Sequence, residues 1–196
     1  DYFQATKGGG HGDYHCIVLG PSTVQEAMDL TISGFDLADQ YRTPVIILGD
    51  GMLGQMMEPI RIPQAKTKIF EKPWALTGAK GRKPNVIRSL FLGDGVLEAF
   101  NEKLQEKYRK IIQSESRFEA TQVDDAQVVL VAYGSMARIC KSVMQQLRQE
   151  GIKAGLIRPI SLWPFPAEVL AKTAEKVKNF LVVEMSAGQM VEDVKL

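Results

Sequence analysis

The sequence predicts an α/β protein built from two doubly wound modules with mostly parallel sheets. Two stretches, 16–48 and 128–157, each show an apolar run, an amphipathic segment and a second apolar run. The apolar runs are short, rich in β-branched residues and free of polar alternation, which is typical of parallel strands covered on both faces. Between them, apolar residues recur at the 3.6-residue period of a helix. Each stretch should form a strand–helix–strand unit, and we expect the second to be right-handed.

The first module is predicted over residues 1–60. Its elements are a strand at 16–19, a helix at 24–41, a strand at 44–48 and a short helix at 52–57. Ser22 or Thr23 can cap the long helix, with Glu26 in its first turn. Gly34 inside that helix costs about 1 kcal/mol relative to alanine. A close packing contact is therefore expected at Gly34.

Residues 61–122 have a different character. Prolines and lysines punctuate the stretch up to 84, namely Pro63, Pro73, Pro84, Lys66, Lys68, Lys72, Lys80 and Lys83. This pattern favours an ordered linker over a core segment. A long charged helix is predicted from Leu97 to Phe118. Its expected buried stripe is Phe100, Leu104, Tyr108, Ile111 and Ile112.

The second module is predicted over residues 123–196. A buried strand at 128–132 leads through a glycine turn into a helix that begins near Met136. Gly151 occupies the position expected of a helix C-cap glycine. The remaining predicted elements are a strand at 152–157, a rigid apolar turn at 161–166, a helix at 167–177 and a buried strand at 180–185.

Composition and charge exclude several classes of protein. The chain has 196 residues, of which 45% are hydrophobic, enough for the cores of one or two domains. Its net charge of +1 provides no long-range field that favours nucleic acid or a membrane surface. No apolar run approaches the roughly 20 residues of a transmembrane helix. The chain begins with Asp1 and ends in the start of a helix, so we interpret both ends as cuts through a longer protein.

The two cysteines argue against a metal site within this chain. Cys16 and Cys140 are far apart in sequence and lie in no closely spaced ligand pattern. So few cysteines are typical of a reduced, cytoplasmic setting.

Chemistry in such a fold is expected beyond the carboxyl ends of the strands. The turn 132–135 leads into a helix N-terminus, which could hold a phosphate on free amides or be an ordinary tight turn. It lacks the second and third glycines of a dinucleotide fingerprint. Glu184, at another strand end, could receive a ligand hydroxyl or cap the next turn; capping is the favoured interpretation.

The glycine-rich loop 8–13 holds the catalytic candidates. A histidine beside a carboxylate, His11 and Asp13, could act as a general base with its orienting partner. The alternative is that both side chains only hold the loop in shape.

Three further residues are candidates for cofactor binding. Gly10 and Gly12 free the backbone for close approach to a ligand, and Asp50 follows a strand end. Asp50 could equally be a turn residue in an Asp-Gly pair. His15, next to a buried strand, is expected to be a packing residue.

Six motifs spread along the chain resemble one family. They are GGHGD, IVLGPSTVQEAMDL, RTPVIILGDGMLGQM, VVLVAYGSMARI, GLIRPISLWPFP and VVEMSAGQMVEDV. Together they resemble the α subunit of 2-oxoacid:ferredoxin oxidoreductases, collinearly from end to end. The segment KPWALTGA and the stretches at 107–108 and 124–126 look more like the branched-chain 2-oxoisovalerate type than the 2-oxoglutarate type.

The resemblance implies an enzyme assembled from several subunits. Such enzymes decarboxylate a 2-oxoacid, pass electrons to ferredoxin and deliver the acyl group to coenzyme A. It implies thiamine diphosphate shared with a β subunit, with Mg²⁺ and a 4Fe-4S cluster held by partner subunits, and γ and δ subunits in addition. Residues 1–60 would be the end of the pyrimidine-binding domain, 61–122 a linker, and 123–196 a Rossmann-type, transketolase C-terminal-like domain.

The same resemblance implies that this polypeptide alone is inactive. The family's cofactor-activating glutamate and its substrate loops lie upstream of the matching motifs. The loop with His11 and Asp13 would lie toward the active-site side. Two alternatives stay open: part of a transketolase or of a dehydrogenase β subunit, and a non-catalytic α/β module for nucleotide binding or assembly.

Overall fold

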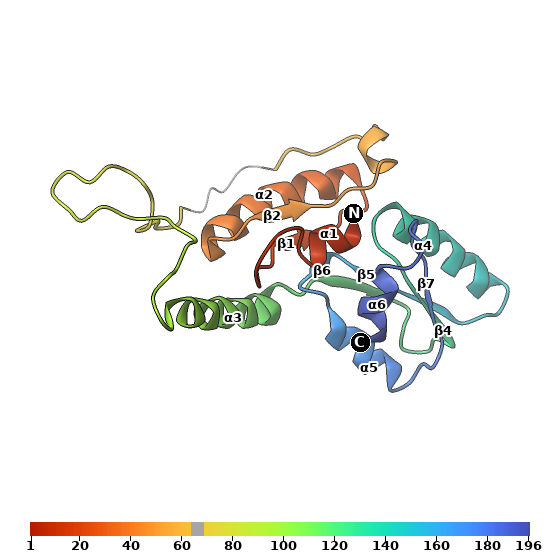
Figure 1. Ribbon diagram of the computed structural model, residues 1–196. Coiled ribbons are helices and arrows are strands. Elements are labelled where there is room, and N and C mark those ends of the chain that lie inside the picture. Colours follow the sequence, from red (N-terminus) through yellow and green to blue (C-terminus); the bar gives the residue numbers. More distant parts are fainter. Residues whose placement is uncertain (64–68) are drawn as a thin grey trace.

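The computed structural model describes residues 1–63 and 69–196, and it arranges them as two sheets flanked by helices (Figure 1). The first sheet has the order β2-β1-β6 and the second β3-β5-β4-β7. Lys66 and Lys68 of the predicted linker lie outside the described residues. An α/β fold with parallel strands in each sheet is confirmed.

The first sheet is built around β1. Its elements are α1 Tyr2–Thr6, β1 Ile17–Leu19, α2 Val24–Tyr41, β2 Val45–Ile47 and β6 Ser161–Trp163. β2 runs parallel to β1, as predicted, whereas β6 runs antiparallel to it. Because β6 comes from the far end of the chain, the first sheet is completed by the segment predicted to belong to the second module.

The second sheet contains the predicted parallel unit. Its elements are β3 Phe118–Thr121, β4 Val128–Val131, α4 Gly134–Gln149, β5 Ala154–Pro159, α5 Ala167–Ala174, β7 Phe180–Val182 and α6 Met190–Lys195. β4 runs parallel to both β5 and β7, and β3 is an antiparallel edge strand. The strand–helix–strand prediction for β4, α4 and β5 is confirmed.

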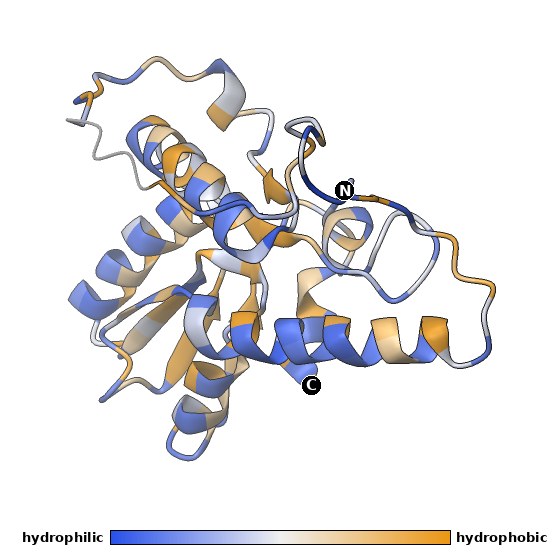
Figure 2. Cartoon of the chain, turned by 90° about the vertical axis from the view of Figure 1, so that its left-hand side faces the viewer, coloured by the Kyte–Doolittle hydropathy of each residue, from blue (hydrophilic) through white to orange (hydrophobic). Residues whose placement is uncertain are grey.

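The central strands are covered on both faces, which explains their unbroken apolar runs. Along β4, Val129 and Val131 face a core shared with α1, α5 and the first sheet. Leu130 and Ala132 face the opposite core, under α4. In β1, Ile17 and Leu19 likewise pack against α2 and α3. Figure 2 shows the strands as mainly hydrophobic and the outer helix faces as mainly hydrophilic.

Several local predictions are confirmed. Thr23 caps α2 and accepts a hydrogen bond from the Glu26 amide. A Cβ at Gly34 would lie 3.3 Å from the Val45 side chain, so this glycine does mark a close contact. Gly151 follows the end of α4 with φ +87°. Capping residues and conspicuous glycines are recognised from the residue type and its place in the local pattern, so these features could be predicted from the sequence.

The long helix differs from its prediction at both ends. α3 runs over Val96–Glu115, and Phe118 begins β3. Tyr108 and Ile111 are buried, but Phe100 and Ile112 are 44% and 47% exposed. Only the C-terminal half of α3 lies against the body of the protein, so the predicted stripe is not buried along its whole length.

Other elements also depart from the predictions. The predicted helix at 52–57 is a single 3₁₀ turn, Leu53–Gln55. The apolar turn at 161–166 contains β6, and α1 is not among the predicted elements. β7 is an edge strand with Leu181 55% exposed, so the prediction of a fully buried strand there is wrong. Over residues 1–63 and 69–196, no helix combines the length and apolarity needed to cross a bilayer.

Candidate functional site

A cleft of about 270 Å³ lies where the carboxyl ends of β2, β4 and β7 meet. Strand ends of both sheets meet there because the two modules pack against each other through one core. The lining residues include Asp1, Tyr2, Asp50, Tyr133, Met136 and Glu184. Strand ends are where ligands bind in parallel α/β sheets. This cleft is therefore the first candidate site.

Asp50 joins the two modules across this cleft. Its Oδ1 accepts hydrogen bonds from the Leu53 amide at 2.9 Å and from the Ser135 hydroxyl at 2.8 Å. Its Oδ2 accepts one from the Ser135 amide at 2.8 Å. Burial alone would raise the pKa of Asp50, but these donors outweigh it and hold the pKa below its usual value. The carboxylate is fixed in its charged form.

Asp50 occupies the place at which a phosphate could have bound to the turn 132–135. The first turn of α4 has free amides that attract an anion. The chain supplies that anion itself, since the Asp50 carboxylate sits on the amide and hydroxyl of Ser135. The predicted alternative, an ordinary turn without phosphate, is the one that the geometry supports.

Glu184 has the capping role favoured from the sequence. Its carboxylate accepts hydrogen bonds from the amides of Gln189, Met190 and Val191 at the start of α6, at 3.0 to 3.2 Å. Burial would raise the pKa of Glu184, but the Ser186 hydroxyl and these amides lower it overall. Glu184 shapes the cleft wall.

The glycine-rich loop does not line this cleft. His11 and Asp13 are exposed, and neither makes a hydrogen bond to another described residue. Tyr14 folds back under the loop: its hydroxyl accepts from the Gly9 amide at 3.1 Å and would lie 3.0 Å from a Cβ at Gly10. Gly12 has φ +89° and open space around it. The structure does not bring this loop together with Asp50.

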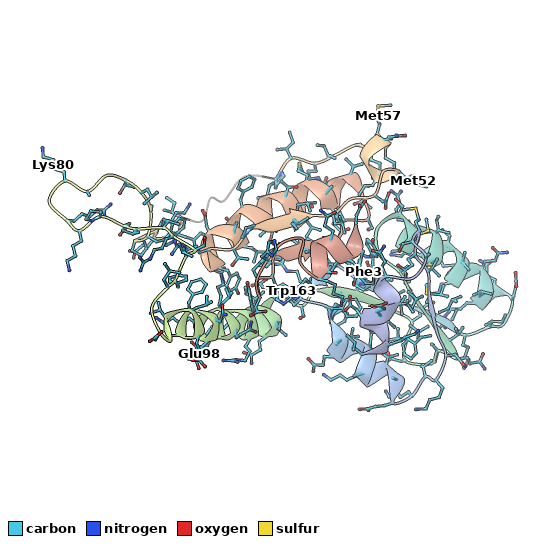
Figure 3. All side chains as sticks on the ribbon, viewed as in Figure 1. Phe3, Met52, Met57, Lys80, Glu98 and Trp163 are labelled. Carbon is cyan, nitrogen blue, oxygen red and sulfur yellow. The ribbon has the colours of Figure 1, made fainter. Side chains whose placement is uncertain are left out.

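His15 is a packing residue, as the sequence suggested. Its ring stacks on Trp163 with centroids 4.7 Å apart and meets Tyr108 edge-on at 5.2 Å. Trp163, labelled in Figure 3, comes from β6, so this aromatic cluster ties the late segment to the first module. The buried Nδ1 of His15 has no hydrogen-bond partner among the described residues.

Acidification should destabilise the fold through His15. Burial lowers the pKa of His15, so the unfolded chain takes up the proton at a higher pH than the folded chain. The stabilisation is complete above the unfolded pKa of about 6.5 and is lost as the pH falls from there toward the folded pKa. Urea unfolding measured between about pH 7.5 and about pH 5.5 should show this decline.

The variant His15→Gln should show a flatter dependence over the same pH range. His11 is exposed in the folded chain, so His11→Gln is the matched control and should keep the wild-type dependence. If the free energy of unfolding of His15→Gln fell with pH as steeply as that of the wild-type chain, His15 would not be the source of this pH dependence.

An ionic network between the modules was not predicted from the sequence. Arg158, at the end of β5, donates to both carboxylate oxygens of Glu26 in α2, at 2.9 and 3.0 Å. Its Nε donates to Glu119 at 3.0 Å. Glu26 also accepts from the Ser22 amide at 2.7 Å. One feature of the sequence could have indicated this network: Arg158 stands at the end of an apolar run predicted to be a buried strand. A buried charge needs a partner of opposite charge.

The described residues offer no metal centre. Over 1–63 and 69–196, no group of three or more histidine, cysteine or acidic side chains is placed to hold a metal ion. The N-terminus of α4 is likewise not open to a phosphate group, because the Asp50 carboxylate occupies it.

These features define a class: an α/β chain of two modules, in which strand ends of both sheets meet at one cleft. Two family models match this chain. "Pyruvate flavodoxin/ferredoxin oxidoreductase, thiamine diP-bdg" matches residues 1–122, and "Pyruvate:ferredoxin oxidoreductase core domain II" matches residues 126–196. The chain belongs to the thiamine diphosphate-binding family of pyruvate flavodoxin/ferredoxin oxidoreductases.

Curated relatives match the chain over its whole length. Ketoisovalerate oxidoreductase subunit VorB of Methanothermobacter marburgensis is 50% identical, covering 100% of this chain and 56% of the relative. 2-Oxoglutarate synthase subunit KorA of the same organism is 33% identical, covering 100% of this chain and 59% of the relative. The chain therefore spans little more than half the length of these relatives.

A solved structure supports the fold. The 2-oxoglutarate:ferredoxin oxidoreductase from Magnetococcus marinus, with 2-oxoglutarate, coenzyme A and succinyl-CoA bound, matches with a TM-score of 0.75 and 25% identity. The match covers 98% of this chain and 39% of the solved chain. Both modules thus have counterparts in one enzyme.

Proposed function

We propose that this chain is part of the α subunit of a cytoplasmic 2-oxoacid:ferredoxin oxidoreductase. The complex would convert a 2-oxoacid and coenzyme A to acyl-CoA and carbon dioxide, with the released electrons passed to ferredoxin. Branched-chain 2-oxoisovalerate is the proposed substrate and 2-oxoglutarate the alternative. The observation that carries this choice is the 50% identity to a ketoisovalerate oxidoreductase subunit, against 33% for a 2-oxoglutarate synthase subunit.

The chain's proposed contribution is a scaffold rather than the reacting groups. Two of its carboxylates at the cleft are already engaged, Asp50 with Ser135 and Glu184 with the start of α6. No metal-ligand group occurs in the described part of the chain. This supports a division of labour in which a β subunit holds the diphosphate and Mg²⁺, a partner subunit holds the 4Fe-4S cluster, and γ and δ subunits complete the complex.

We further propose the division into residues 1–60, 61–122 and 123–196. The matched family models divide the chain near residues 122 to 126, which supports the second boundary. β6 qualifies the division, because it lies in the third segment yet pairs with β1 in the first.

For the loop, we propose that His11 and Asp13, with Gly10 and Gly12, lie near the substrate in the assembled enzyme. Their exposure in this chain supports that placement, since both side chains are free to meet a partner. Asp50 would act on the cofactor site only indirectly, by holding the loop after β2.

The proposed substrate preference predicts a measurable difference. The full-length α subunit, co-purified with its β subunit, should form acyl-CoA from 2-oxoisovalerate with a kcat/KM at least about tenfold higher than from 2-oxoglutarate. A pocket shaped for an apolar branch would leave the second carboxylate of 2-oxoglutarate without a partner. Reduced ferredoxin and acyl-CoA should appear together.

Two results would contradict this. Preference for 2-oxoglutarate would reassign the substrate. Turnover that needs a lipoyl or sugar acceptor, and no ferredoxin, would point instead to a dehydrogenase or transketolase.

A further inference from the structure

The glycine-rich loop 8–13 is held at both of its ends by distant parts of the chain. Before the loop, Lys7 forms an ion pair with Asp193 in α6. After the loop, the amide of His15 donates a hydrogen bond to the Tyr108 hydroxyl in α3 at 2.7 Å. The conformation between these two anchors therefore depends on contacts made within the loop itself.

Tyr14 makes those contacts. Its hydroxyl oxygen accepts a hydrogen bond from the Gly9 amide at 3.1 Å. Its ring lies against Gly10, where an added Cβ would meet the hydroxyl oxygen at 3.0 Å and ring carbons at 3.4 and 3.6 Å. Gly8 and Gly12 have φ of +95° and +89°. Because glycine restricts the backbone less than any other residue, such a loop would sample many conformations without the phenol.

A cleft of about 350 Å³ opens beside the contact between Tyr14 and the loop. Gly9 and Tyr14 form one part of its lining, and Ile46 of β2 with Cys16 and Leu48 forms another. A concave site with apolar walls and a few polar groups is typical of small-molecule binding. Tyr14 therefore touches both the loop and a space large enough for a small ligand.

The two polar side chains of the loop are available to a ligand. His11 and Asp13 are exposed, and neither makes a hydrogen bond to another described residue. The structure thus fixes the backbone of the loop while leaving these side chains unengaged. A backbone that is ordered before the ligand arrives lowers the entropy cost of binding.

We propose that Tyr14 is a positioning residue, whose phenol holds the loop in the conformation in which His11 and Asp13 meet the 2-oxoacid. This inference rests on the proposed function, which puts the loop near the substrate. Tyr14 acts through the loop and not on the reacting atoms. Loss of its hydroxyl should therefore weaken substrate binding and leave the chemical step nearly unchanged.

Steady-state kinetics of the full-length α subunit, co-purified with its β subunit, test the proposal. The substrate is the better of 2-oxoisovalerate and 2-oxoglutarate. Tyr14→Phe keeps the ring but removes the acceptor of the Gly9 amide. The KM for the 2-oxoacid should rise about fivefold, as expected for one lost hydrogen bond, while kcat and the KM for coenzyme A stay within about twofold. A variant that merely folded less well would lose kcat instead, because less active enzyme would be present.

Gly10→Ala tests the same contact from the other side. Its methyl group would meet the Tyr14 hydroxyl at 3.0 Å, so the loop must shift and the KM should rise about fivefold. In Gly10→Ala/Tyr14→Phe that hydroxyl is gone, and the nearest ring carbon lies at 3.4 Å. Alanine at this position should therefore raise the KM of Tyr14→Phe no further, which is the non-additivity expected of residues in contact.

Tyr41→Phe is the matched control. It also removes a phenol hydroxyl, one that donates to Glu115 at 2.8 Å and makes no contact with the loop. Its KM for the 2-oxoacid should stay within about twofold of the wild-type value.

Three outcomes would overturn the proposal. A wild-type complex that turns over neither 2-oxoacid would remove the proposed function, and the inference with it. An active wild-type complex whose KM is unchanged in Tyr14→Phe would remove only the role of Tyr14. An equal effect of Gly10→Ala with and without the Tyr14 hydroxyl would show that the phenol does not hold the loop.

Discussion

Replacing Arg158 with alanine should lower the free energy of unfolding by about 3 kcal/mol, since it leaves an uncompensated charge in a mostly buried site. The Arg158 side chain is 9% exposed and that of Glu26 is 20% exposed. Without the guanidinium, Glu26 loses two hydrogen bonds and Glu119 loses one. Chemical denaturation of the wild-type and Arg158→Ala chains gives the difference directly.

The matched control is the ion pair between Lys172 and Glu168 on α5, whose side chains are 71% and 80% exposed. Lys172→Ala should leave the free energy of unfolding almost unchanged, because water and salt screen an exposed ion pair. A double variant, Arg158→Met with Glu26→Gln, should recover part of the loss, because no charge is then stranded and Ser22 keeps an acceptor. Equal effects of Arg158→Ala and Lys172→Ala would show that the network does not join the modules.

The variant Gly134→Ala should cost about 3 kcal/mol, through two effects at one position. Gly134 has φ +60°, which is unfavourable for alanine, and a new Cβ would lie 2.7 Å from Oδ2 of Asp50. Asp50 would have to move, and Ser135 would lose its acceptor. The measurement is again the free energy of unfolding.

Gly151→Ala separates the two effects. Gly151 has φ +87°, but a Cβ added there would meet nothing within 4 Å, so this variant should cost only about 1 kcal/mol of backbone strain. Asp50→Gly combined with Gly134→Ala should restore space for the methyl group. If Gly134→Ala proved no worse than Gly151→Ala, Asp50 would not be held where the structure places it.

Elements governed by local rules could be predicted from the sequence. The apolar runs of β1, β4 and β5 and the helical periods of α2 and α4 depend on each element's own residues. The order of these elements and the parallel direction of their strands could therefore be predicted from the sequence. β6 could not be found this way, because three residues in a Pro-rich turn, Ser161–Trp163, become a strand only where β1 offers an edge. β3 depends on β5 in the same manner.

The site was less predictable than the fold. Glu184 was correctly assigned as a cap because its partners follow within seven residues. Asp50 and Ser135 are 85 positions apart, and Arg158 and Glu26 are 132 apart. No spacing rule joins such pairs, so only the folded chain shows that these charges hold the two modules together.

We propose above all that this chain supports the chemistry but does not perform it alone. The direct test is single-turnover release of carbon dioxide from carboxyl-labelled 2-oxoisovalerate in the presence of thiamine diphosphate and Mg²⁺. We predict release by the full-length α subunit joined to its β subunit, and none by the 196-residue chain by itself. Release by the isolated chain would contradict the account.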